Sequence, residues 1–300
     1  MRLSRRGFSL TELLISLVMM GIVGGAMMKL LTGMQRISRS QAEQVELQSN
    51  VRTGALVVPA EMREMGYDVD DLGNVFDTDL VAMAADRVQF RAMRGIGFIC
   101  AFSGAGGFVT DVWIRRPFYG VRDPQLTDGY RLFVEQDFNL GADDRWVNLV
   151  PTNVDLASNC GADPAIRLTF PVPVLPGTAS QVPVTAVFVG APIRTFEVME
   201  FGLFAQGGRS WLGARSVSIG EVNFQPVVGP LENGTGFGLS YRAADNTVVP
   251  VTGNPANVRT IQVTLNGETD PPIALAGQGK ARTEKWSLST RVALRNAQRP

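Results

Sequence analysis

The residue with the clearest chemical consequence in this chain is Glu12, a carboxylate inside a long apolar segment. Apolar side chains fill most of residues 8–31 around it. An acidic side chain within a membrane span costs about 2.5–3.5 kcal/mol on insertion scales, so it is a functional candidate by default. Its chemistry would be ion pairing with a buried cation, because a buried charge is tolerated only when it is paired.

The apolar segment itself predicts a membrane-spanning helix. At about 1.5 Å per residue, residues 8–31 would extend roughly 36 Å as a helix, which is enough to cross a bilayer. Arg2, Arg5 and Arg6 precede it, so the positive-inside rule places the N-terminus in the cytoplasm. A secretory signal peptide would have a shorter apolar region and a small-residue cleavage site. The plainer alternative is a signal anchor whose Glu12 lies near the interface.

Residues 7–14 read Gly-Phe-Ser-Leu-Thr-Glu-Leu-Leu and resemble the class III signal of type IV pilins and of type II secretion pseudopilins. The resemblance implies that a prepilin peptidase cleaves between Gly7 and Phe8 on the cytoplasmic side and then methylates the Phe8 amine. It also implies that Glu12 pairs with the Phe8 amine of a neighbouring subunit when such helices bundle into a filament. We therefore expect Glu12→Ala to insert into the membrane but not to assemble normally.

Residues 32–66 predict an amphipathic continuation of this helix. Apolar residues recur there at steps of three and four, which is typical of one helix face. We expect that face to pack on the chain's own sheet rather than in a coiled coil. Pro59 should kink or restart the helix, and Gly66 is a stop signal. The expected packing face consists of Ile37, Gln41, Val45, Gln48, Val51, Ala55, Val58, Met62 and Met65.

Later segments resemble a narrower group, the PilW minor pilins and the J-type pseudopilins. Residues 61–67 are similar to the arginine and glycine-tyrosine pattern that closes the PilW helix. Residues 288–296 resemble the closing strand of both groups. Residues 196–215 look like the family's paired strands, and residues 258–265 look like a later strand.

Residues 67–300 are predicted to form a strand-rich exported head. Apolar residues make up 45% of the chain and charged residues 19%, which suffices for a real core. The fold class is therefore α+β: a long N-terminal helix packed on an antiparallel sheet, with a large strand-rich head. The domains are a leader (1–7), a membrane half (8–31), an amphipathic half (32–66) and the head (67–300). Expected strands are 87–91, 111–115, 130–135, 165–170, 184–189, 196–204, 217–224, 237–241, 260–265 and 286–294; expected loops are 171–183, 226–236 and 243–257.

Two cysteines, Cys100 and Cys160, occur in the predicted head. Export would place both outside the cytoplasm, where disulfides persist, and only one pairing is available. We expect a structural disulfide, with two buried free thiols as the alternative. Two cysteines without any histidine do not make an ordinary zinc site unless carboxylates join them, so no metal site is expected.

No residue pattern indicates catalysis or a cofactor. The chain contains no histidine, which removes the usual triads and most transition-metal sites. Cleavage after Gly7 would remove three of the 28 basic side chains and leave 25 against 28 acidic ones. A nucleic-acid-binding surface is generally more basic. We therefore expect no enzymatic activity, no cofactor and no nucleic-acid partner.

Together these patterns predict a minor pilin that primes or caps a type IV pilus through helix bundling and head contacts. The resemblance implies four partners: prepilin peptidase, other minor and major pilins, an inner-membrane assembly platform and membrane lipid. It places the chain in the inner membrane as a single-pass protein with a periplasmic head, and then in the pilus at the cell surface. The alternatives are a J-type minor pseudopilin of type II secretion, or an adhesin or binding protein that uses the signal for export.

Overall fold

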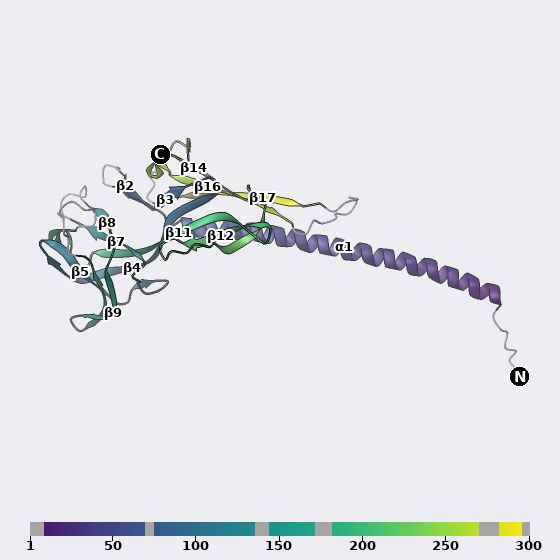
Figure 1. Ribbon diagram of the computed structural model, residues 1–300, viewed down its shortest axis with the longest axis horizontal. Helices are drawn as coiled ribbons and strands as arrows, with labels where there is room; N and C mark the ends of the chain where they lie inside the picture. The colour runs from purple at the N-terminus through teal and green to yellow at the C-terminus, as the bar shows by residue number, and fades with distance from the viewer. Residues whose placement is uncertain (1–8, 70–74, 136–143, 172–181, 270–281, 296–300) are drawn as a thin grey trace. The chain divides into compact units, whose positions relative to one another are not determined.

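The structure is a computed structural model that describes residues 9–69, 75–135, 144–171, 182–269 and 282–295 (Figure 1). Helix α1 covers Leu10–Met62. The strands after it form antiparallel pairs, so the α+β class predicted from the sequence is confirmed. The chain divides into two compact units, one containing residues 1–49 and 268–286 and the other containing residues 50–267 and 287–300.

The strands of the head are short, apart from two long ones. The order of the main sheet is β15-β14-β16-β13-β12-β11-β4-β5-β10-β9, and β17 pairs with β16 outside that path. The strands are β1 Tyr67–Val69, β2 Val75–Thr78, β3 Leu80–Met83, β4 Arg87–Ala105, β5 Phe108–Arg115, β6 Tyr119–Gly120, β7 Gly129–Val134, β8 Arg145–Leu149, β9 Asn153–Cys160, β10 Asp163–Thr169, β11 Pro192–Gln206, β12 Arg209–Ser216, β13 Gln225–Leu231, β14 Phe237–Arg242, β15 Val248–Val249, β16 Thr260–Glu268 and β17 Lys285–Ala293.

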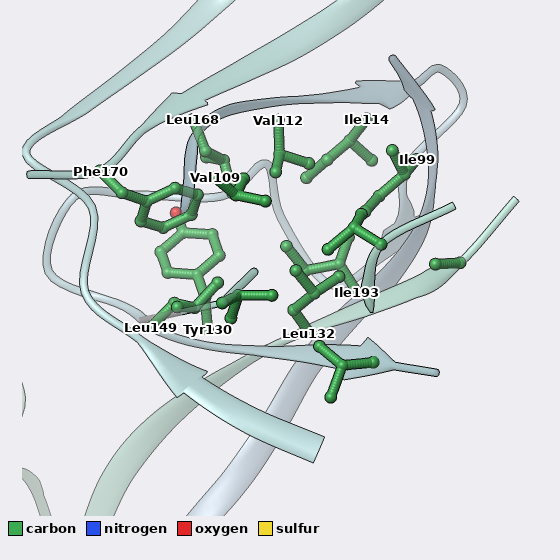
Figure 2. Close-up of a cluster of buried hydrophobic side chains, with 14 of the residues drawn as sticks. Ile99, Val109, Val112, Ile114, Tyr130, Leu132, Leu149, Leu168, Phe170 and Ile193 are labelled. Atoms are coloured by element: carbon green, nitrogen blue, oxygen red, sulfur yellow. The ribbon is translucent and has the colours of Figure 1, made fainter. Parts of the chain in front are cut away.

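Strand β4 links two layers of the head. Residues 87–98 pair with β11, and residues 99–105 pair with β5. Between these layers lies a dry core, in which Val112, Ile114 and Leu168 point toward Tyr130 and Leu132 (Figure 2). All five side chains are fully buried. The alternation of inward apolar residues along β5, β7 and β10 is what places these side chains in one core.

The last part of α1 packs on the sheet of its own unit. Val51, Val58 and Met62 are buried there. Gly54 lies on the same face, and a Cβ at this position would come within 2.8 Å of Leu265 Cδ1. Because glycine has no side chain, the helix backbone lies so close to the sheet here that an added Cβ would require Leu265 to move.

Helix α1 runs through Pro59, so of the kink or restart predicted there, the restart is wrong. α1 continues to Met62, and the Arg63 N–H donates to the Pro59 carbonyl at 3.0 Å. Proline removes one backbone hydrogen bond and crowds the carbonyl four residues before it, but the buried Val58 and Met62 hold the last turn on the sheet. The helix ends before Gly66, whose N–H donates instead to Asp79 Oδ2 at 2.9 Å.

The packing face predicted for residues 37–48 is wrong. Ile37 is 43% exposed and Val45 is 66% exposed, whereas Leu47 is buried. Leu47, Val51 and Gly54 belong to one face, so the prediction holds at Val51 but is offset by one residue where it chose Gln48 instead of Leu47. One residue corresponds to a rotation of about 100° around a helix, so the two glutamines marked a solvent-facing side.

Two of the predicted strands are wrong. Residues 184–189 begin with a 3-10 turn, Val184–Ala186, and their buried Ala186 and Val187 join the core from a loop. A short apolar run does not distinguish a strand from a buried loop by periodicity alone. Residues 217–224 form a turn in which Gly220 has a φ of +75°, a backbone conformation that favours glycine.

Strand β13 lies where the sequence predicted a loop. Gln225–Leu231 contains Pro226 and Pro230, which normally argue against a strand. Its pairing with β12 has two register shifts, so it does not need a complete ladder of backbone donors. The two-residue strand β15 likewise falls within the predicted loop 243–257.

Candidate processing and assembly site

The first turn of α1 is organised around Glu12. The backbone N–H of Ser9 donates to Glu12 Oε2 at 3.2 Å, and the N–H of Thr11 donates to Ser9 Oγ at 3.3 Å. A serine before the first helical residue and a glutamate three residues later form the pattern known as a capping box. Glu12 is therefore directed toward the N-terminal end of the helix.

This cap leaves Glu12 able to bind a second group. A carboxylate has about four acceptor positions, and the Ser9 N–H uses one of them. The side chain is exposed, and its negative charge is favourable in the first turn because of the helix dipole. The Ser-x-x-Glu spacing of residues 9–12 is a sequence signal that could have predicted this cap.

Gly7 and Phe8 lie outside the described residues. Cleavage between them, methylation of Phe8 and pairing of its amine with Glu12 therefore stay predictions. The chain is already helical shortly after the expected cleavage point, because α1 begins at Leu10, two residues beyond Phe8.

The membrane half of α1 is apolar and has no cover from the described part of the chain. An 18-residue window of α1 has a mean hydropathy of 2.0, and none of that window is buried. By length and composition, this helix could cross a membrane. Apart from the helix's own backbone, no described atom lies within 4 Å of the Cβ positions of Gly21 and Gly25, so their small-xxx-small face is open for close helix packing.

Asp77 is the centre of an ionic network in the head that the sequence did not predict. Its Oδ2 accepts hydrogen bonds from Arg91 at 2.9 Å and from Asn148 at 2.8 Å, and it also pairs with Arg131. Burial alone would raise the pKa of the Asp77 carboxyl. The Asn148 hydrogen bond and the charges of Arg91 and Arg131 outweigh burial, so that the pKa lies below its usual value.

Asp79 shares Arg131 with Asp77 but has the opposite balance. Its Oδ1 lies 2.9 Å from Arg131 Nη1. Burial is the largest influence on Asp79 and raises its pKa, although Arg131 and the Gly66 N–H act against that shift. No local sequence pattern indicates these contacts, because their members are distant along the chain.

A second network ties the last turn of α1 to the head. Glu61 lies 3.5 Å from Arg94 Nη1, and Arg94 Nε donates to Glu197 Oε2 at 2.9 Å. Glu61 belongs to α1, Arg94 to β4 and Glu197 to β11. These contacts and the Asp77 network connect strands and the helix end within one unit and hold them together.

Cys100 and Cys160 are joined by a disulfide. The bond links β4 to β9, the terminal strand of the main sheet, across 60 residues of sequence. Among the described residues, no group of three or more His, Cys, Asp or Glu side chains could hold a metal ion.

Comparison with known families identifies the N-terminal signal. Residues 2–28 match the family model described as the prokaryotic N-terminal methylation motif. The chain therefore carries a type IV pilin-like signal, and such a signal implies processing by prepilin peptidase. No curated protein and no solved structure matches the chain.

Proposed function

We propose that this chain is a minor pilin that primes or caps assembly of a type IV pilus. The observation that carries the proposal is the methylation motif at residues 2–28, joined to an exposed apolar helix with a capped Glu12. The chain would enter the inner membrane with its N-terminus in the cytoplasm. Prepilin peptidase would then cut between Gly7 and Phe8 and methylate the new amine.

Assembly would use the charge pair that processing creates. The cationic amine of Phe8 and the carboxylate of Glu12 both lose water when apolar helices bundle, and each is tolerated there only with an opposite charge nearby. The capping box supports this role, because it holds Glu12 toward the helix end while leaving further acceptor positions.

The size of the head supports a minor rather than a major pilin. Residues 67–300 would have to pack repeatedly in a helical lattice if the chain were the main subunit. A low-copy position at the tip or in the priming complex avoids that demand. Its partners would be other minor and major pilins, the inner-membrane assembly platform and membrane lipid. The proposal assigns no catalytic role, because the sequence contains no histidine or other recognisable catalytic set.

A J-type minor pseudopilin of type II secretion would have the same signal and helix. An exported adhesin would also have them, but it would not be needed for piliation. Deletion of the gene separates these functions: loss of pili supports the proposal, loss of secretion supports the pseudopilin, and intact pili with lost adhesion supports the adhesin.

The decisive experiment compares Glu12→Ala with Glu46→Ala, an exposed glutamate on the same helix, in the native host. We expect both variants to be cut after Gly7 and methylated, as measured by intact mass. Only Glu12→Ala should be absent from sheared pili, because it leaves the Phe8 amine without its counter-charge. Wild-type incorporation of Glu12→Ala, or an unprocessed mass for the wild-type chain, would contradict the proposal.

A further inference from the structure

Strand β17 has an unpaired edge in the described structure. β17 runs beside β16 (Figure 1), and within the described residues it pairs with no other strand. Its residues 287–293 contain no proline, although natural edge strands are commonly protected by proline, bulges or inward-pointing charges. Residues 287–293 and Glu12 belong to different units of the chain, so this edge is a second candidate for contact in addition to Glu12.

The hydrogen bonds just beyond β17 show which backbone groups face that edge. The Leu294 N–H donates toward the β16 side, to the Arg259 carbonyl at 3.0 Å, whereas the Arg295 N–H donates to the Met65 carbonyl at 2.7 Å. Backbone groups alternate in direction along an antiparallel strand. The groups of Ser289 and Arg291 therefore face the same side as those of Arg295.

An apolar pocket opens beside the same edge. It has a volume of about 350 Å³ and lies between α1 and β17. Leu56 of α1, which is 70% exposed, and Leu288 of β17 contribute much of its apolar wall. Arg52 brings a positive charge to the lining. The full lining is Arg52, Ala55, Leu56, Leu288, Ser289 and Thr290.

We propose that this edge and pocket bind an extended segment of a partner protein, which adds a strand to β17. A helix could fill the pocket, but its backbone bonds are internal, so it would leave the β17 edge unpaired. An extended segment satisfies both features: main-chain hydrogen bonds supply affinity, and a pocket for alternate side chains supplies specificity.

The chemistry of the two sides defines the partner segment. Alternate side chains of a strand point to opposite faces, so one set meets the pocket and must be aliphatic. The other set lies beside Ser289 and Arg291, on the polar outer face, and must be polar. Arg291, which is exposed, favours an acidic residue in the polar set. The partner is therefore an extended, alternating aliphatic and polar segment with acidic residues.

The test uses the full chain, purified in detergent, and two displayed peptide libraries of equal composition. One library alternates aliphatic and polar residues, and the other places the aliphatic residues at helical spacing. We expect enrichment from the alternating library. Binding of the selected peptides is then measured by fluorescence anisotropy, which does not depend on filament assembly.

Two matched pairs of variants locate the binding. Arg291→Pro removes the N–H that faces the edge, which an edge strand tolerates, while Arg291→Ala retains it. Leu56→Glu places a charge in the pocket, while Val222→Glu changes another exposed aliphatic residue, 78% exposed in the wild type. Arg291→Pro should bind the selected peptides about tenfold more weakly than Arg291→Ala does. Leu56→Glu should bind them more weakly than Val222→Glu does.

Several outcomes would overturn the inference. Enrichment of the helical library, enrichment of neither library, or equal binding by Arg291→Pro and Arg291→Ala would each do so. If Arg291→Pro does not fold, the selected peptide is instead N-methylated at alternate amides and tested on the wild-type chain. Two forms are made, each methylated at one of the two alternating sets of amides. Strand addition predicts that the form with methylated edge-facing amides no longer binds. Unchanged binding by both forms contradicts strand addition.

Discussion

The two ends of helix α1 are both apolar, but they differ in what surrounds them. Met20, in the membrane half, is 75% exposed, whereas Met62, in the last turn, is fully buried. Apolar residues occupy every side of the helix near Met20, so no single sheet could cover them. Near Met62, the buried apolar residues Val58 and Met62 share one face, whereas Leu56 is exposed on another. The first half of the helix therefore has no cover among the described residues, while the last turns pack on the chain's own sheet.

The largest effect should come from shortening a buried side chain of the helix. Met62→Ala removes a side chain packed in the sheet interface and should lower the free energy of unfolding of the head by about 2–5 kcal/mol. Met20→Ala is the matched control and should leave that free energy unchanged. Both are measured by urea titration of the detergent-solubilised chain. Equal effects of the two substitutions would remove the contrast between the two ends.

Loss of the disulfide should affect only the head. Replacing Cys100 and Cys160 by alanine should lower the free energy of unfolding by about 2–4 kcal/mol, because the crosslink restricts the unfolded chain. Membrane insertion should be unchanged, as measured by fractionation. A reductant should destabilise the wild-type chain to the same extent and have no further effect on the double variant.

The Asp77 network should make the head sensitive to acid. The pKa of Asp77 is lowered in the folded protein, so its contribution is complete above the ordinary value of 3.8 and is lost as the pH falls through the lower, folded value. Asp77→Asn should cost roughly 1–3 kcal/mol at neutral pH, since it weakens bonds to two partly buried arginines.

The same substitution should flatten the acid limb of the stability curve, which urea titrations between neutral pH and pH values below 3.8 would reveal. Asp163→Asn, at an exposed position, is the control. If the free energy of unfolding of Asp77→Asn falls with acid as steeply as that of the wild type, other carboxylates govern acid unfolding.

The smallest effect should appear at the start of the membrane half. Ser9→Ala removes a helix cap, which is worth about 1 kcal/mol and corresponds to roughly fivefold faster amide exchange in the first turn. Amide hydrogen exchange at Leu10–Leu13 measures this loss of the cap, and amide exchange near Met62 should not change. An unchanged rate at Leu10–Leu13 would mean that the Ser9 cap does not stabilise this turn.

How far the sequence predicts the structure depends on whether each element carries its own pattern. β16 alternates apolar and polar residues from Thr260 to Asn266, and its position follows from that alternation, whereas β5 and β7 were predicted from short apolar runs. β4 was predicted only over residues 87–91, because Gly95 and Gly97 interrupt the pattern. Those glycines lie against Phe118, a contact that no local rule anticipates.

The candidate sites also differ in whether a local sequence pattern reveals them. Glu12 and the signal around it are recognisable because they occur within a few adjacent residues. Asp77, Arg131 and Asn148 meet only when β2, β7 and β8 come together, so spacing along the chain carries no sign of them. Likewise, Ser218 Oγ accepts a hydrogen bond from the Val198 N–H at 2.8 Å, which helps to make a turn from an apolar run predicted as a strand.

The passage of β4 through both layers of the head has a consequence for cooperativity. Its 19 residues would extend roughly 60 Å, and they supply hydrogen bonds to β11 at one end and to β5 at the other. Neither layer can open fully without disturbing a strand that the other layer needs. Amides near Val88 and near Phe102 should therefore exchange through a common opening event, as parts of one folding unit rather than two.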